Sequence, residues 1–130
     1  MSKIAVFGGT GYLASLIKNQ NNVKKNKYIF FSIKKTSKNY FNHSSLKKNI
    51  DNLKNFDFIM HLAGPNQDQL TRNENLIKKK NQITSIICDL CIVHNIKLIY
   101  VSSIQVYKDY GKSNLSINSK INLKNLYSKS

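Results

Sequence analysis

Short apolar runs alternate with longer amphipathic segments along the chain. Four runs are rich in β-branched and aromatic residues and predict strands buried in a sheet: 3–7, 28–33, 57–62 and 97–101. The pair Tyr40–Phe41 adds a short further strand. Because nearly continuous apolar strands are typical of sheets covered on both faces, the pattern favours parallel pairing.

Helical spacing of apolar residues fills the intervals between the strands. Leu13, Leu16 and Ile17 indicate a helix within 11–20, and a shorter helix is expected within 47–55. The longest helical pattern precedes the last strand, and its apolar face consists of Leu76, Ile83, Ile86, Ile87, Leu90, Cys91 and His94. Residues 108–125 are polar and loop-like, and a further helix begins near Tyr127.

This alternation predicts an α/β fold with a doubly wound parallel sheet of about five strands. The 130 residues contain no internal repeat and no Pro/Gly-rich linker, so 1–130 form one domain. No stretch approaches the ~20 consecutive apolar residues that a membrane helix needs. Glycines rather than a cleavage site follow the first apolar run, so no signal peptide is expected and the predicted location is cytoplasmic.

The composition is strongly basic, with 21 lysine plus arginine residues against 6 acidic ones and a formal net charge of +15. Such a charge is typical of nucleic-acid binding. However, every basic residue except Arg72 is a lysine, the lysines are scattered, and asparagine and isoleucine, which also have AT-rich codons, are heavily used. Biased codon usage therefore explains the charge better than a nucleic-acid partner, which stays as a lesser alternative.

Cys88 and Cys91 fall late in the longest helical pattern. A three-residue spacing places both thiols on one helix face, whereas a thioredoxin-type pair opens a helix after a strand. A zinc site would need two further ligands at a matching spacing, which the sequence lacks. Both cysteines are therefore expected to face the core.

The first strand leads into a glycine-rich segment, Gly8-Gly9-Thr10-Gly11-Tyr12-Leu13-Ala14. It fits both Gly9-x-Gly11-x-x-Ala14 and the wider Gly8-x-x-Gly11-x-x-Ala14 spacing of dinucleotide-binding turns. Glycines there permit a tight turn and let backbone N–H groups approach a pyrophosphate at the helix N-terminus. The segment predicts a dinucleotide cofactor and a Rossmann-like sheet, and the lack of a following Lys-Ser/Thr excludes a P-loop.

The second strand ends without the acidic residue that holds the ribose 2′-hydroxyl of NAD. The sequence there is Ser32-Ile33-Lys34-Lys35, and no carboxylate lies between Asn19 and Ile50. A lysine could pair with a 2′-phosphate, so NADP is favoured over NAD. The alternative is that Lys34 and Lys35 are two further products of codon bias.

With these segments the sequence resembles the extended short-chain dehydrogenase/reductases, the NAD-dependent epimerase/dehydratase family. The matching segments, in family order, are Gly8–Ala14, Asp57–Gly64, Asn81 and Leu98–Tyr107. In this family a tyrosine follows the catalytic serine by about two dozen residues, and a lysine follows the tyrosine by four on the same helix face. Tyr127 follows Ser103 by 24 residues. The position of the lysine would be 131, whereas Lys129 points to a different side.

The resemblance implies roles for individual residues. Tyr127 would be the general acid/base and Ser103 its partner at the substrate oxygen, while the nicotinamide exchanges the hydride. The implied cofactor-binding residues are Gly8, Gly11, Tyr12, Leu13, Ser32, Lys34, Leu62, Ala63, Gly64, Asn81, Val101 and Ser102. His61 is interpreted as a hydrogen-bonded strand-end residue, and Asp57 as a cap at the strand start.

The resemblance spans nearly all of the 130 residues but only the first half of a family member. Departures are the missing acidic residues near Lys34 and Asn42, and Lys108 in place of the family's glycine after Val-Tyr. We expect the N-terminal NAD(P)-binding part of a nucleotide-sugar epimerase, dehydratase or reductase, without its substrate domain and inactive as this fragment. A homodimer is an expectation for the full-length parent alone. The leading alternative is a non-catalytic dinucleotide-binding or sensor module.

Overall fold

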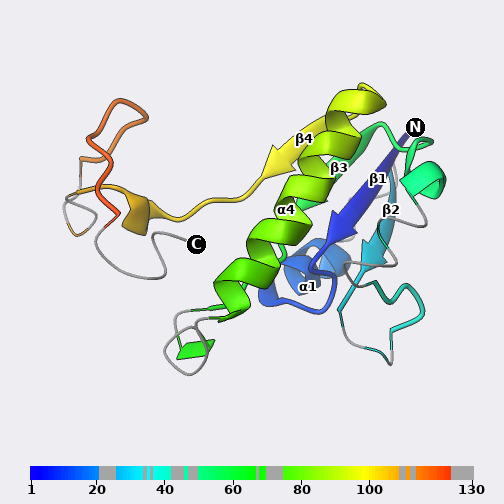
Figure 1. The fold of residues 1–130 in the computed structure, drawn as a ribbon, viewed down its shortest axis with the longest axis horizontal. Coiled ribbons are helices and arrows are strands. Elements are labelled where there is room, and N and C mark those ends of the chain that lie inside the picture. The colour runs from blue at the N-terminus through cyan, green and yellow to red at the C-terminus, as the bar shows by residue number, and fades with distance from the viewer. Residues whose placement is uncertain are drawn as a thin grey trace.

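The computed structural model describes residues 1–20, 26–33, 35, 37–41, 46, 50–66, 68–69, 75–108, 111 and 114–123. Its four named strands are parallel and lie in the order β2-β1-β3-β4 (Figure 1). They span Ser2–Phe7 (β1), Asn26–Phe31 (β2), Phe58–His61 (β3) and Lys97–Tyr100 (β4). The helices are α1 (Tyr12–Asn19), η2 (Ile50–Leu53), α4 (Asn75–Val93) and η3 (Ile104–Val106). The predicted parallel α/β fold is confirmed.

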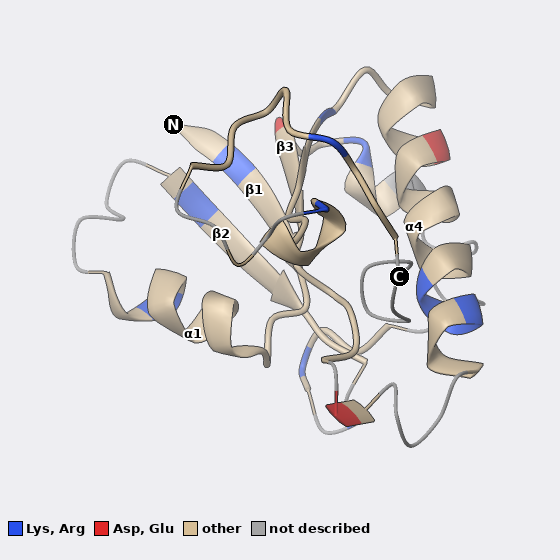
Figure 2. Cartoon of the chain, turned by 90° about the vertical axis from the view of Figure 1, so that its left-hand side faces the viewer, with Lys and Arg blue, Asp and Glu red and all other residues tan. Residues whose placement is uncertain are grey.

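The two longer helices cover opposite faces of the sheet, as Figure 2 shows. Alternate residues of β1 pack on the two sides of the sheet, because successive side chains of a strand point to opposite faces. On the α4 side, Ala5, Phe7 and Ile59 pack in a cluster with Ile87 and Leu90. On the other side, Ile4 and Val6 pack with Ala14 of α1. The double cover explains why Ile4 to Phe7 are all buried and why this strand is a continuous apolar run.

The start of β3 is joined to β1 through Asp57. The Lys3 N–H donates to the Asp57 carboxylate at 2.7 Å, and the Asp57 N–H donates to the Lys3 carbonyl at 2.9 Å. Asp57 therefore caps the strand start, as the sequence predicted.

The short strand predicted at Tyr40–Phe41 is reduced to one isolated bridge between Ser32 and Tyr40. The Ser32 N–H donates to the Asn39 carbonyl at 3.0 Å, and the Phe41 N–H donates to the Ser32 carbonyl at 2.9 Å. The N–H and the carbonyl of Ser32 are thus both hydrogen-bonded. However, β2 itself ends at Phe31, so the pairing with residues 39–41 is limited to Ser32. Within the described residues the sheet has four strands plus this bridge, rather than about five strands.

Phe41 still contributes to the core, because its ring lies edge-on to Phe7 with 5.0 Å between the centroids. The helix expected within 47–55 is shorter in the described residues, as the 3-10 turn η2. The long helix α4 buries Ile86, Ile87, Leu90 and Cys91, which belong to the predicted apolar face.

The two cysteines lie on α4 as expected, with Cys91 buried and Cys88 half-buried. Burial, and then the neighbouring Cys88 thiol, raise the pKa of the Cys91 thiol, so Cys91 stays protonated and unreactive. In the part of the chain that the structure describes, no three His, Cys, Asp or Glu side chains are grouped to hold a metal ion. The same part contains no helix that is long and apolar enough to cross a membrane.

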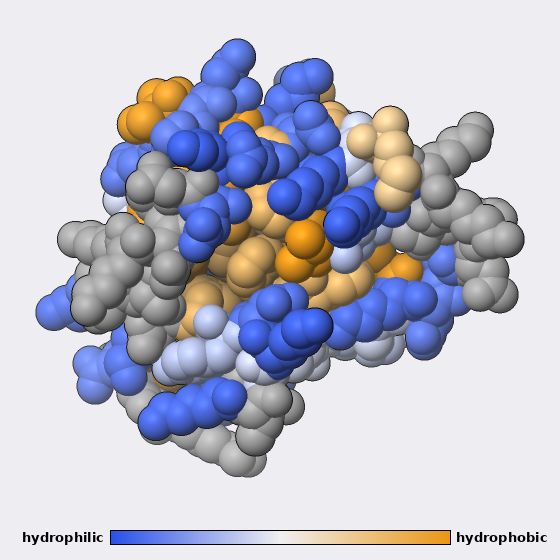
Figure 3. Space-filling view, turned by 90° about the vertical axis from the view of Figure 1, so that its right-hand side faces the viewer, coloured by the Kyte–Doolittle hydropathy of each residue, from blue (hydrophilic) through white to orange (hydrophobic). Residues whose placement is uncertain are grey.

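Apolar residues gather on the face drawn in Figure 3, and hydrophilic residues border them. Several lysines of the molecule contact aromatic rings, which the scattered charge of the sequence did not indicate. Among the described residues, four ammonium groups lie over rings: those of Lys3 (Phe56, 4.5 Å), Lys18 (Phe30, 4.6 Å), Lys80 (Tyr100, 5.5 Å) and Lys97 (Phe58, 5.4 Å). Within about 6 Å of a ring centroid such a cation is attracted to the ring face.

Candidate functional site

The glycine turn joins β1 to α1 at the carboxyl edge of the sheet. Gly8 has a φ of +97°, which L side chains rarely adopt, and a Cβ there would lie 2.8 Å from the Ala63 nitrogen. The end of β1 therefore passes directly against the backbone that follows β3. The N–H groups of Gly8 and Gly9 both donate to the Phe31 carbonyl, at 3.1 and 2.7 Å, so the turn is also joined to β2.

Helix α1 begins without a side-chain cap. Gly11 is the N-cap residue, its N–H donates to the Gly8 carbonyl at 2.9 Å, and the first turn of the helix contains no acidic residue. The first N–H groups of an α-helix have no intrahelical partner and carry partial positive charge. Tyr12 is 77% exposed and Leu13 44% exposed, so this helix end is open to solvent. Such an end suits an anion, in particular a phosphate.

Hydroxyl groups lie at the end of β2, where dinucleotide-binding sheets carry an acidic residue. Ser32 is buried, and its Oγ lies 3.0 Å from Oγ1 of Thr10 in the glycine turn. Lys35 is exposed, whereas Lys34 lies outside the described residues. The prediction that Lys34 pairs with a 2′-phosphate therefore falls outside the described residues. The structure shows a polar feature that the sequence did not predict, the hydrogen bond between Thr10 and Ser32.

The segment after β3 meets the glycine turn. The Leu62 N–H donates to the Phe7 carbonyl at 2.8 Å, and the Ala63 backbone lies against Gly8. A Cβ on the exposed Gly64 would lie 3.5 Å from Cε of Lys80 on α4, and Asn81 follows Lys80 on that helix as an exposed residue. The fold thus brings Gly8, Leu62 and Ala63 together and places Asn81 on the helix beyond them.

His61 is buried between β3 and α4. Its Nε2 lies 2.8 Å from Thr84 Oγ1, and the Thr84 hydroxyl donates to the Lys80 carbonyl at 3.0 Å. Because that hydroxyl has one proton, His61 Nε2–H is the donor to Thr84. Nδ1 is buried and has no hydrogen-bond partner among the described residues. Burial, and then the positive charge of Lys80, lower the pKa of His61 to about 4, so the ring is neutral near pH 7.

These contacts support the interpretation of His61 as a strand-end residue, with one ring nitrogen paired and the other not. Its ring also lies edge-on to Tyr100, with 5.4 Å between the centroids. The sequence gives no sign of the role of Thr84 beyond its position four residues after Lys80, the spacing at which its hydroxyl meets the Lys80 carbonyl. Its pairing with His61 depends on how α4 packs on the sheet.

The predicted serines follow β4. The Val101 N–H donates to the His61 carbonyl at 3.3 Å, which extends the pairing one residue past the strand, and Ser102 is exposed. Ser103 is the N-cap of η3, and its Oγ accepts from the Gln105 N–H at 3.2 Å. The Ser103 oxygen is thereby engaged as an acceptor, and no acceptor for its own proton is found among the described residues.

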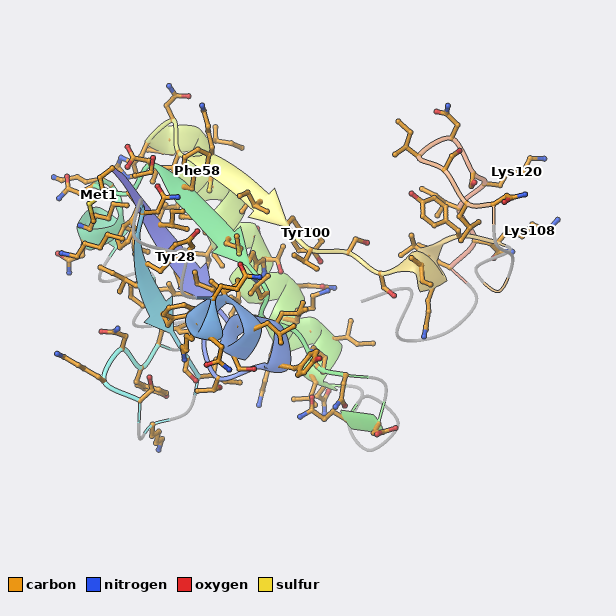
Figure 4. All side chains as sticks on the ribbon, turned by 180° about the vertical axis from the view of Figure 1, so that it is seen from behind. Met1, Tyr28, Phe58, Tyr100, Lys108 and Lys120 are labelled. Atoms are coloured by element: carbon orange, nitrogen blue, oxygen red, sulfur yellow. The ribbon has the colours of Figure 1, made fainter. Side chains whose placement is uncertain are left out.

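The chain after Tyr100 runs away from the sheet. Figure 4 shows Tyr100 at the end of β4, with Lys108 and Lys120 well to one side of the sheet. The chain segments that carry these two lysines are hydrogen-bonded to each other, since the Lys108 N–H donates to the Lys120 carbonyl at 2.8 Å. Among the described residues, no hydrogen bond joins Ser103 to the glycine turn. Tyr127 and Lys129 lie outside the described residues.

A comparison of the chain with models of known protein families found a match. The model of the NAD dependent epimerase/dehydratase family matches residues 4–130. A comparison with curated proteins found no match.

Solved structures share the fold. UDP-N-acetylglucosamine 4-epimerase from Bacillus cereus matches with a TM-score of 0.75 and 23% identity, over 99% of this chain and 50% of that one. UDP-glucose-4-epimerase from Stenotrophomonas maltophila, solved with bound NAD and formylated UDP-arabinopyranose, matches with a TM-score of 0.80 and 10% identity, over 99% and 45%. L-threonine dehydrogenase from Clostridium difficile matches with a TM-score of 0.80 and 16% identity, over 99% and 45%.

These identities are low, so the structural matches establish the fold alone. The chain spans half or less of the length of each of these three proteins. The family match, in contrast, covers nearly the whole chain. The chain belongs to the NAD dependent epimerase/dehydratase family.

Proposed function

We propose that this chain binds a nicotinamide dinucleotide at the glycine turn, as the N-terminal cofactor-binding domain, 1–130, of an enzyme that acts on nucleotide-linked sugars. The observation that carries the proposal is the uncapped, solvent-open N-terminus of α1, which follows a turn whose Gly8 lies against the backbone of Leu62 and Ala63. Family membership and the epimerase neighbours support it. The reaction is an epimerisation, dehydration or reduction.

Each part of the cofactor has a candidate partner. The N–H groups of Tyr12 and Leu13 would face the pyrophosphate, with Gly8 and Gly11 permitting its approach. Thr10 and Ser32 would serve the adenosine ribose. The segment 62–64, Val101, Ser102 and Asn81 would serve the nicotinamide half. When bound, the nicotinamide supplies or takes up a hydride.

The catalytic roles rest on the family pattern. Ser103 would donate its hydroxyl proton to a substrate oxygen, and Tyr127 would move a proton there. A tyrosine has an ordinary pKa of ~10 and needs a nearby cation to act near neutral pH. The family places that lysine four residues after the tyrosine, which would be position 131.

NADP stays the favoured form of the cofactor on the sequence evidence alone. The buried Ser32 presents a hydroxyl rather than a carboxylate at the end of β2, which removes one reason to prefer NAD. Two related solved structures, however, are described with NAD, one with bound NAD and one with NAD+ and UDP. Parallel titrations with NADPH and NADH decide the question, and tighter NADH binding would overturn the preference. Cytoplasmic location and a homodimeric parent stay predictions.

The test of the cofactor site is a fluorescence titration of the chain with NADH and NADPH. Tyr12→Glu adds a carboxylate at the first residue of α1, where it stabilises the helix end but repels a pyrophosphate. We expect Tyr12→Glu to weaken dinucleotide binding about tenfold or more without lowering the melting temperature. Gln82→Glu, on the exposed side of α4, adds the same charge and should leave binding unchanged.

Three outcomes separate the competing functions. Absence of dinucleotide binding by the unaltered chain would refute the proposal. Dinucleotide binding by the protein without any turnover of nucleotide sugars would favour the non-catalytic module. Binding of random DNA with a steep salt dependence would favour a nucleic-acid partner, since phosphate contacts release counterions.

A further inference from the structure

One lysine reaches back from the end of α1 to the glycine turn. Lys18 is the basic residue of the last turn of this helix. Its Nζ donates to the Gly9 carbonyl at 2.5 Å and lies 4.6 Å from the centroid of the Phe30 ring. A single side chain thus connects α1, the turn and β2.

The Gly9 peptide is held on both sides by these contacts. Its N–H donates to the Phe31 carbonyl at 2.7 Å, and its carbonyl accepts from Lys18. A Cβ on Gly9 would lie 2.7 Å from Cβ of Phe30, so the turn also fits closely against β2. The Gly9 carbonyl therefore has a charge-assisted hydrogen bond, and such bonds are stronger than neutral ones.

The residues that follow Gly9 form the open helix end. Gly11 N–H donates to the Gly8 carbonyl at 2.9 Å, so a rotation of the Gly9 peptide would alter the turn that precedes α1. A site whose donors are already in place avoids the free-energy cost of ordering them when the ligand binds.

We propose that Lys18 is a positioning residue for dinucleotide binding: it fixes the Gly9 peptide so that the N–H groups at the start of α1 converge on the pyrophosphate. This inference rests on the proposed function of the glycine turn. Lys18 acts through Gly9 and need not touch the cofactor. Its charge near an anion would also attract the cofactor directly, and the test separates these two effects.

Three variants of Lys18 and one matched control make the test. Lys18→Met removes the charge and the hydrogen bond but keeps a long apolar chain over Phe30. Lys18→Gln keeps a neutral donor, and Lys18→Arg keeps a charged one. Lys97→Met is the control, because Lys97 also lies over an aromatic ring, 5.4 Å from the Phe58 centroid, but at the opposite end of the parallel strands.

The measurements are dinucleotide affinity at low and high salt, and hydrogen exchange of the chain without cofactor. We expect Lys18→Met to weaken binding about fivefold to tenfold at both salt concentrations, and Lys18→Arg to restore most of it. The amides of Thr10 and Gly11 should exchange faster in Lys18→Met but not in Lys97→Met. Lys18→Gln should retain part of the affinity.

Equal affinities of Lys18→Met and Lys97→Met, with unchanged exchange at Thr10 and Gly11, would overturn the inference while leaving the proposed function intact. A loss of affinity that disappears at high salt would assign Lys18 to direct charge attraction and would also overturn it. Absence of dinucleotide binding by the unaltered chain would refute the proposed function, and faster exchange in Lys18→Met would then still support the contact with Gly9.

Discussion

The glycine turn and the segment that carries Ser103 are held in different ways. The turn continues directly from β1 and is contacted by the Phe31 carbonyl of β2 and by the backbone after β3. The segment from Ser102 to Leu123, in its described residues, makes its backbone hydrogen bonds with itself, as between Lys108 and Lys120 or Val106 and Asn122. Figure 1 shows the described part of this segment, coloured yellow to orange, extending from the end of β4 away from the sheet.

This difference separates the proposed cofactor site from the proposed catalytic residues. Parallel strands bring Gly8, Leu62 and Ala63, which we propose to bind the cofactor, to one edge of the sheet within the described residues. Ser103 caps η3 and, among the described residues, makes no hydrogen bond to the turn. The described sheet therefore supports the proposed cofactor site, whereas Tyr127, the proposed partner of Ser103, lies outside the described residues.

The largest expected effect is that of Gly8→Val. The substitution imposes a positive φ on a β-branched residue and drives its Cβ to 2.8 Å from the Ala63 nitrogen. We expect a loss of more than about 3 kcal/mol in the free energy of unfolding, measured by urea denaturation. Gly111→Ala is the control, since a Cβ there meets no atom of the described residues within 4 Å. A Gly8→Val chain as stable as the control would show that β1 and β3 do not approach so closely.

The next effect is a pH dependence from His61. The pKa of this ring is about 4 in the folded chain against an ordinary value of 6.5, so the unfolded chain binds more protons between these values. The contribution of His61 to the free energy of unfolding is therefore fully present above pH 6.5. It is lost as the pH falls toward 4, which lowers the free energy of unfolding by about 3 kcal/mol. Urea denaturation at pH 7, 5.5 and 4.5 measures it. His61→Gln should flatten the profile, and His94→Gln should not; an unchanged profile in His61→Gln would exclude this ring as the cause.

A smaller effect is expected at the end of β2. Ser32→Ala removes the buried hydroxyl that pairs with Thr10 and should cost about 1 kcal/mol in unfolding free energy. It should also weaken dinucleotide binding, because the glycine turn loses its side-chain connection to β2. Unfolding and binding are measured on the same preparation, and unchanged affinity would remove this pair from the candidate site.

The smallest effect is expected for Ser103→Ala. The substitution removes the cap of η3, a three-residue turn, and should cost about 0.5 kcal/mol or less in unfolding free energy. Dinucleotide affinity should not change, in contrast to Ser32→Ala. A clear loss of affinity in Ser103→Ala would show that this segment lies against the cofactor in solution.

The sequence alone predicted the strands, the apolar face of α4, the cap at Asp57 and the turn Gly8–Gly11, because each depends on local spacing and on residues adjacent in the chain. Periodicity shows which face of an element is buried, and glycines show where the backbone must turn. The family resemblance followed from the same local segments.

Only the tertiary structure decided which distant residues meet. The reduction of Tyr40–Phe41 to one bridge follows from where β2 ends, and the His61–Thr84 bond from how α4 packs across β3. The reach of Lys18 to Gly9 could not be distinguished from the background of other lysines in the sequence. Such contacts join residues that are far apart in the chain or hidden in a common composition, so their geometry appears only when the strands and helices are packed together.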